Sequence, residues 1–404
     1  MSLSSTLESD AHELRPEITD LRHRLHQHPE IGLQLPKTQQ ILLDELDSIG
    51  LELSVGTSLT SVTGILRGGG KGPAILLRAD MDALPVQERS GESFSSQIDG
   101  AMHACGHDLH MAMLVSAARL LAAQRDQLAG DVVFMFQPGE EGWNGAGAMI
   151  DEGILTAAGP MVSAAYGMHV RSNKTQNGVF TTKGGIMMSS SSRLEVKVNG
   201  AGGHGSAPHS SLDPIAAAAE MVGSLQMMVT RRFDIFDPVV ITVGVIEGGT
   251  RSNIIPDSAL FQATVRTFSV ETAEKIGPYV AAVCKGIALA HGLDVEVNHI
   301  PEYPATVNDP ASAEFVANVA RDVFGSDSFV HMEFPEAGSE DFSRVLQQVP
   351  GSYMMLGASM SEDYAGAPTN HSPLARFDDR ILTKGALMHA ELAVRSLAHL
   401  SSMA

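Results

Sequence analysis

Along the first part of the chain, short apolar runs typical of strands alternate with segments whose apolar residues have helical spacing. Short β-type apolar runs are expected at 63–68, 73–80, 131–137 and 162–170. Between them, helical spacing predicts helices over 38–50 and 108–130. Gly50 is the expected C-cap of the first helix and Asp108 the expected N-cap of the second. Strands that alternate with helices in this way predict a parallel or mixed sheet covered on both faces.

The pattern changes near Ser189, where strict apolar and polar alternation begins. A strand over 192–200 is followed by a helix with Asp213 as its cap and Pro214 in its first turn. The remaining elements are expected as strands at 239–249, 258–268 and 293–300 and a helix at 270–292. This β-α-β-β-α-β order is typical of a ferredoxin-like domain. We therefore expect an α/β fold in which 1–188 and 304–404 form a larger domain, with an α+β domain inserted at 189–303.

Composition narrows the classes of partner. The chain has 404 residues, which suggests about two to three domains, and a formal net charge of −20. A polyanion repels phosphate backbones and anionic lipids, so we expect neither a nucleic acid nor a membrane partner. The N-terminal residues show no secretory signal pattern, and the two cysteines are far apart. These features favour the cytoplasm, where thiols stay reduced.

The stretch "HACGHDLHMA" gathers three histidines and a cysteine within eight positions. In an extended segment Cys105 and His107 point to the same side, and His103 can share that side. The segment precedes a long helix and so lies at the sheet edge where α/β proteins bind ligands. The alternative is a small buried cysteine beside surface histidines. Four further histidines are expected to face solvent: His23, His26, His28 and His110.

A second candidate is the pair Glu140 and Glu141, which follows a predicted buried strand. Adjacent carboxylates repel each other, and their burial is costly without a cation. In a turn the two side chains point in different directions, so one can bind a metal while the other handles a proton. Two solvated glutamates in a surface turn are the alternative interpretation.

Other candidates lie near predicted strand ends of the same domain: Asp80, Asp82, His169 and His371. Cysteine, histidine and glutamate are typical ligands of a divalent ion such as zinc. They are too numerous for one tetrahedral ion. Two ions that share a bridging thiolate or carboxylate fit better.

Several blocks resemble the aminoacylase/carboxypeptidase metallopeptidase family, and especially its hippurate hydrolase and indoleacetyl-amino-acid hydrolase group. These blocks are "LRHRLHQHPEIG", "RADMDALP", "HACGHDLHMA", "QPGEEGWNGAGAMI", "GMHV", "NGAGGHGSAPH", "GGTRSNIIPD" and "GSEDFS". They occur in the expected order from about Leu21 to His371. The resemblance implies a zinc-peptidase-like catalytic domain whose inserted ferredoxin-like domain serves as a lid and in dimerisation.

The resemblance also implies roles for individual residues. Cys105 matches the bridging metal ligand, and four residues match the other ligands: His107, Glu141, His169 and His371. Glu140 matches the general base, and Asp82 matches the acid that orients a ligating histidine. His204 matches a histidine of the lid domain that reaches an active site, in dimeric relatives that of the partner. Asn253 and Arg266 match residues that bind the substrate carboxylate or the reacting carbonyl.

The activity so implied is metal-dependent hydrolysis of N-acyl amino acids to a carboxylate and a free amino acid. Two divalent ions are expected per subunit, with zinc or manganese as the first candidates and cobalt or nickel as the next. A homodimer or higher homo-oligomer is also expected. A dipeptidase or carboxypeptidase and an N-acetyl-diaminopimelate deacetylase are alternatives within the family. A cysteine hydrolase with Cys105 as nucleophile and His107 as base, and a non-catalytic metal-binding protein, are the alternatives of other classes.

Overall fold

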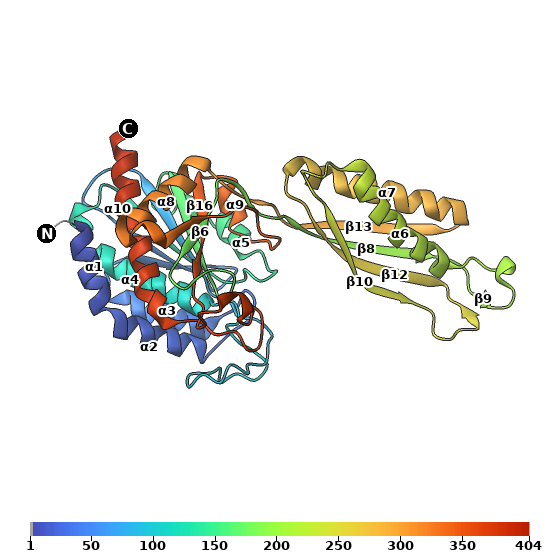
Figure 1. Cartoon of the computed structure of the whole chain (residues 1–404), viewed down its shortest axis with the longest axis horizontal. Helices are drawn as coiled ribbons and strands as arrows, with labels where there is room; N and C mark the ends of the chain where they lie inside the picture. The colour runs from blue at the N-terminus through green and yellow to red at the C-terminus, as the bar shows by residue number, and fades with distance from the viewer. Residues whose placement is uncertain (1–2, 404) are drawn as a thin grey trace. The chain divides into compact units, whose positions relative to one another are not determined.

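The computed structural model describes residues 3–403, which divide into two compact units (Figure 1). Unit 1 contains the described residues up to Met187, the segment Val307–Phe334 and the chain from Asp341 onward. Unit 2 contains Met188–Thr306 together with Pro335–Glu340. Within residues 3–403, no helix combines the length and the apolar character that crossing a bilayer requires.

Unit 1 is built on an eight-stranded sheet of order β1-β2-β4-β3-β5-β16-β6-β15. β3, β4, β5 and β16 pair in parallel, whereas β1, β2 and β4 pair antiparallel, which confirms the predicted mixed sheet. Every residue of β3 is buried, so both faces of this strand are covered. The strands are β1 Glu52–Val55, β2 Val62–Leu66, β3 Ala74–Asp80, β4 Asp131–Gln137, β5 Ala164–Arg171, β6 Phe180–Thr182, β15 Phe329–His331 and β16 Gly351–Gly357.

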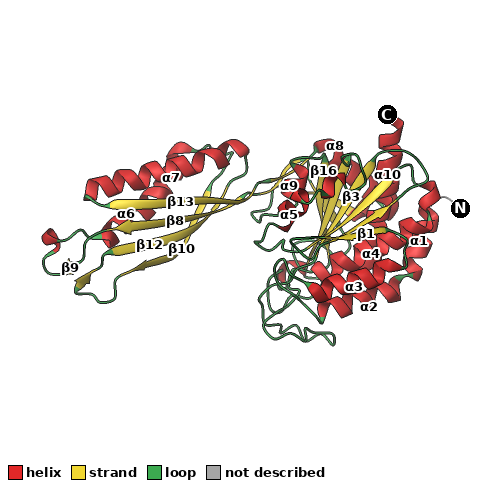
Figure 2. Ribbon diagram, turned by 180° about the vertical axis from the view of Figure 1, so that it is seen from behind, coloured by secondary structure: helices red, strands yellow, loops and turns green. Residues whose placement is uncertain are grey.

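Helices cover this sheet, as Figure 2 shows. α4 and α10 pack on each other and on β3, α8 packs against β16 and β6, and α5 packs against β4. α1, from the start of the chain, packs against α10 from its end. The helices are α1 Leu3–Glu13, α2 Arg15–His26, α3 Pro36–Asp47, α4 His107–Ala123, α5 Gly145–Asp151, α8 Pro310–Phe324, α9 Ser343–Leu346 and α10 Leu382–Met403.

Unit 2 has the predicted β-α-β-β-α-β order, with an antiparallel sheet of order β10-β12-β8-β13. The carboxylate of Asp213 accepts a hydrogen bond from the backbone nitrogen of Ile215 (2.9 Å), which confirms the predicted cap. Two short strands, β9 (Gly203–His204) and β11 (Ile254–Ile255), pair separately. The main elements are β8 Ser191–Asn199, α6 Pro214–Arg232, β10 Val240–Gly248, β12 Ser258–Arg266, α7 Val270–His291 and β13 Asp294–Tyr303.

Candidate metal centre

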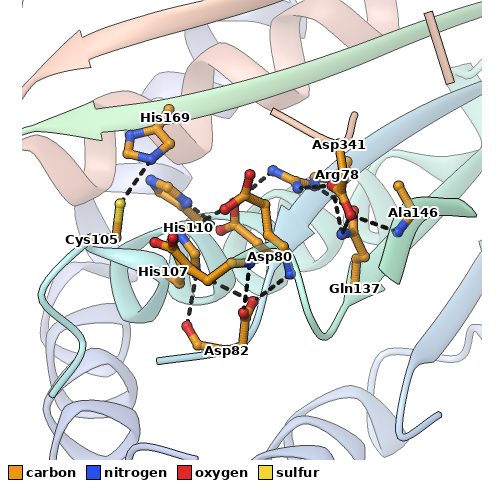
Figure 3. A network of polar contacts seen from close by, with 12 residues as sticks. Arg78, Asp80, Asp82, Cys105, His107, His110, Gln137, Ala146, His169 and Asp341 are labelled. Atoms are coloured by element: carbon orange, nitrogen blue, oxygen red, sulfur yellow. Dashed lines mark hydrogen bonds and ion pairs between the residues drawn. The ribbon is translucent and has the colours of Figure 1, made fainter. Parts of the chain in front are cut away.

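The candidate residues of unit 1 gather at one edge of the large sheet. Asp80 ends β3, His169 lies near the end of β5, and Glu140 follows β4. Because these strands are parallel, their carboxyl ends meet at the same edge. The first turn of α4 brings His107 to the same place (Figure 3).

The segment that carries Cys105 is a turn, so the prediction of an extended segment is wrong. Gly106 has φ 86° and precedes the first residue of α4, which makes it the N-cap in place of Asp108. A Cβ at Gly106 would lie 2.4 Å from Cγ2 of Val170, so close packing requires glycine here. The turn points Cys105 toward the cluster, while His103 is buried near His26 instead.

The thiol of Cys105 lies at the centre of the candidate ligands. Its Sγ is 3.3 Å from Nε2 of His169 and 3.2 Å from Nε2 of His371, and that nitrogen is 3.1 Å from Oε1 of Glu141. Ligand atoms within 4.8 Å of one another define two sets that share this cysteine. The first set is Cys105, His107 and His169, and the second is Cys105, Glu141 and His371.

Hydrogen bonds fix the tautomers of two imidazoles. Nδ1 of His107 lies 2.8 Å from the backbone carbonyl of Asp82, and Nδ1 of His169 lies 2.7 Å from the carbonyl of Val170. A carbonyl only accepts, so both Nδ1 atoms donate, and in the neutral ring Nε2 carries the lone pair. Nε2 of His107 is fully buried without a hydrogen-bond partner, as expected for a nitrogen that ligates a metal.

The carboxylate of Asp82 binds the turn of Glu140 and Glu141, whereas its backbone carbonyl binds His107. Its two oxygens accept hydrogen bonds from the backbone nitrogens of Glu140 and Glu141, both at 3.0 Å. The contact from its Oδ1 to Nδ1 of His107 is longer, at 3.6 Å, because the backbone carbonyl of Asp82 takes that hydrogen bond. Asp82 therefore orients both the histidine and the two glutamates.

The charge of the cluster is negative. The buried guanidinium of Arg78 binds Asp80 (2.6 Å) and Asp341 (3.1 Å), which uses its single positive charge. Three further carboxylates of unit 1 lie at this edge, those of Asp82, Glu140 and Glu141. Burying this excess is unfavourable unless cations enter. Thiolate, imidazole and carboxylate donors together fit divalent ions of the zinc class.

The pKa values of His107 and His371 shift in the direction that this excess predicts, whereas burial and the neighbouring His110 lower the pKa of His169. Hydrogen bonds to Cys105 and Glu141 raise the pKa of His371 to about 10. Burial opposes an imidazolium at His107, but the negative charge of Asp80 outweighs it and raises the pKa of His107. The cluster thus favours positive charge at its centre.

Several residues of this edge were missed or misplaced by the sequence patterns. His110, expected on the helix surface, is buried: its Nδ1 lies 2.5 Å from Asp80, and its Nε2 accepts from the nitrogen of Val170 (2.8 Å). His26, expected to face solvent, is also buried and lies 2.9 Å from Asp108. Histidine spacing gave no signal for these pairings, because the partners come from other elements.

The three remaining candidates lie in unit 2. His204 is exposed on β9, where its Nδ1 lies 2.8 Å from Oγ of Ser206. Asn253 is beside it, because its carbonyl accepts a hydrogen bond from the nitrogen of Gly205 (2.9 Å). Arg266 ends β12 and donates to Oγ of Ser339 (2.9 Å); burial lowers its pKa.

A mixed α/β unit with sulfur, imidazole and carboxylate groups at its carboxyl edge fits the class of metallohydrolases. Residues 76–395 match the model of "Peptidase family M20/M25/M40", and the chain belongs to this family. The resemblance seen in the sequence blocks is thereby confirmed.

The relatives match nearly the full length of the chain. It is 37% identical to thermostable carboxypeptidase 2 of Saccharolobus solfataricus, over 98% of this chain and 99% of that protein. It is 37% identical to IAA-amino acid hydrolase ILR1-like 4 of Arabidopsis thaliana, over 95% of this chain and 86% of that protein. It is 34% identical to hippurate hydrolase of Campylobacter jejuni, over 95% of this chain and 98% of that protein. Among solved structures, a dinuclear metal-binding peptidase of the M20 family from Bacillus subtilis matches with a TM-score of 0.82 and 32% identity, over 96% of this chain and 99% of that one.

Proposed function

We propose that this protein is a metal-dependent amidohydrolase that cleaves N-acyl amino acids to a carboxylate and a free amino acid. One observation carries the proposal: Sγ of Cys105 is shared by two of the candidate ligand sets, Cys105, His107 and His169, and Cys105, Glu141 and His371. A shared thiolate suits two neighbouring cations. The relatives named hippurate hydrolase and IAA-amino acid hydrolase support the substrate class.

In this proposal, Cys105, His107 and His169 would hold one ion, and Cys105, Glu141 and His371 would hold the other. Zinc or manganese is expected, with cobalt and nickel as further candidates, because the donor set suits all of these ions. Bound divalent ions polarise carbonyl groups and acidify water.

Glu140 is the proposed general base. It lies beside Glu141 in the turn that Asp82 clamps, and its side chain is largely buried. Its carboxylate takes the proton of the attacking water and delivers it to the nitrogen of the leaving amine. Asp82 positions this carboxylate through the backbone of the turn.

We also propose that His204, Asn253 and Arg266 contact the substrate, and that unit 2 serves as a lid and in dimerisation. His204 and Asn253 lie at the end of unit 2 where β12 begins, whereas Arg266 is the last residue of that strand (Figure 1). A nine-residue strand spans roughly 26 Å, more than a small substrate does. His204 and Arg266 therefore serve one substrate from two different copies of the chain, which requires a homodimer or higher oligomer.

The edge strand β10 is the proposed contact between copies. It ends the sheet of unit 2 and exposes three large apolar residues: Val240 (48%), Val245 (37%) and Ile246 (60%). Exposed apolar edges promote pairing with another strand unless they are covered. A mixture of H204A and R266A subunits tests the arrangement, because mixed dimers would regain sites with both residues intact.

The test of the function joins elemental analysis with a substrate panel. The purified protein should contain two ions per chain and hydrolyse N-acetyl, N-benzoyl or indoleacetyl amino acids. A dipeptide arm covers the second candidate, a carboxypeptidase or dipeptidase, which the 37% identity to thermostable carboxypeptidase 2 favours. Activity that survives a chelator would contradict metal dependence and favour a cysteine hydrolase. We place the enzyme in the cytoplasm, since both cysteines are free thiols.

A further inference from the structure

Asn370 precedes the candidate ligand His371 and connects three segments of the centre. Its Nδ2 donates to the backbone carbonyls of Cys105 (3.1 Å) and Val170 (3.0 Å), and it lies 3.8 Å from Sγ of Cys105. Its Oδ1 accepts a hydrogen bond from the nitrogen of Ser172 (3.0 Å). All the polar atoms of this side chain are thus used to hold the loop of His371 against the turn of Cys105 and the end of β5.

This connection matters because His371 lies outside regular secondary structure. His107 begins α4, and His169 lies within β5, so regular hydrogen bonding fixes both backbones. His371 lies in a loop with φ 70°, a left-handed conformation that is uncommon outside glycine. Its side chain is 55% exposed, and its backbone nitrogen donates to the carbonyl of Ala104 (2.9 Å). The adjacent residue Asn370 adds a second hydrogen bond to the turn of Ala104 and Cys105.

We propose that Asn370 is a positioning residue that holds His371 against Cys105 and so maintains the ligand set Cys105, Glu141 and His371. The inference rests on the proposed two-ion centre. Residues that orient metal ligands typically change metal affinity about 10–100-fold when they are substituted. N370A should therefore lower the affinity for the ion held by Cys105, Glu141 and His371 by about 10–100-fold. The ion held by Cys105, His107 and His169 should keep its affinity.

The experiment is a zinc titration of the metal-free full chain against a chromophoric chelator, which gives the number and affinity of bound ions. The variants are N370A and N370D. N370D keeps an acceptor for Ser172 but turns an oxygen toward two carbonyls, so it should weaken the binding of the same ion. N177A is the matched control: Asn177 is also half-buried and donates to the carbonyl of Ser359 and to Asp378, both at 2.8 Å.

Wild type and N177A should bind both ions tightly, whereas both Asn370 variants should bind one ion tightly and the other about 10–100-fold more weakly. Cobalt loading adds a second readout, because the thiolate-to-cobalt charge-transfer absorption of Cys105 should persist in N370A. Two ions of unchanged affinity in N370A and N370D, or equal weakening of both ions, would overturn the role of Asn370. If N370A does not fold, N370D decides. Fewer than two ions in wild type would instead contradict the proposed function.

Discussion

His107 and Asp108 are neighbours at the start of α4, yet their side chains belong to two polar clusters that differ in charge balance. We call the group around Cys105, with His107, His169, His371, Glu140 and Glu141, the metal cluster. The second group is the α2 cluster and contains Arg22, His26, Glu88 and Asp108. Asp108 accepts from Nε of Arg22 and lies beside Nδ1 of His26, both at 2.9 Å.

The α2 cluster balances its own charges. Burial opposes charge on His26, but Asp108 and Glu88 outweigh it and raise the pKa of His26 to about 9. Hydrogen bonds from His26 and Ser90 overcome burial and hold the pKa of Glu88 at about 2. At the rim, Asp379 accepts from Arg22 and contacts His23.

The comparison separates a stabilising cluster from a functional one. The α2 cluster pairs two cations with two buried carboxylates, so it fastens α2 to α4 without any ligand. The metal cluster carries an acidic excess that Arg78 does not compensate, so it needs cations from solution. Substitutions in the first should change stability, and substitutions in the second should change metal content and catalysis.

The largest effect is expected for C105A, because the thiolate belongs to both ligand sets. This variant should lose both ions and all measurable hydrolysis, while H371A should retain one ion. Elemental analysis after dialysis measures both. C284A is the control, since Cys284 is buried in the core of unit 2 and should leave two ions in place. Two tightly bound ions in C105A would remove its bridging role.

E140Q should reduce turnover about 10²–10⁴-fold, the usual contribution of a general base. Metal content and melting temperature should stay near those of wild type, because the backbone clamp by Asp82 is intact. Steady-state kinetics and elemental analysis measure these quantities. The control is E152Q, whose carboxylate accepts hydrogen bonds from Thr57 and Ser58. Near-normal turnover in E140Q would assign the base elsewhere.

D108N should lower the free energy of unfolding by about 3–5 kcal/mol, because it removes the buried carboxylate that Arg22 and His26 share and leaves Arg22 only Asp379 at the rim. The protein should still bind two ions below its melting temperature. Urea unfolding and metal analysis test both statements. D20N, which removes an exposed partner of Arg24, should cost less than about 1 kcal/mol. Equal costs for D108N and D20N would show that the α2 cluster adds no stability.

The smallest effect concerns the pH dependence that His26 gives to stability. Its pKa is raised from 6.5 to about 9, so its stabilisation is complete below pH 6.5 and is lost as the pH rises through 9. This difference corresponds to roughly 3 kcal/mol. The gap in unfolding free energy between wild type and H26Q should therefore shrink between pH 6 and pH 9.5. A gap that is constant with pH would mean that His26 is neutral in the folded protein.

The fold followed from local pattern to a large extent. Short apolar runs predicted β3, β4 and β5, and the order of strand-like and helix-like segments predicted the elements of unit 2. These signals are local, since burial of one face sets the spacing within each segment. The acidic and thiol groups also gave a local signal, because their positions directly after predicted strands indicated a metal site.

Tertiary structure alone decided what each polar residue contacts. The sequence by itself determined that Cys105, His107, Glu141, His169 and His371 are available as ligands and that an anionic chain carries them. It did not reveal that Asp108 and His107 serve different clusters, that His110 is buried against Asp80, or that Asn370 holds Cys105. Those contacts join residues that lie 30 to 265 positions apart. Their partners are set by how the sheet and helices pack, which no local spacing encodes.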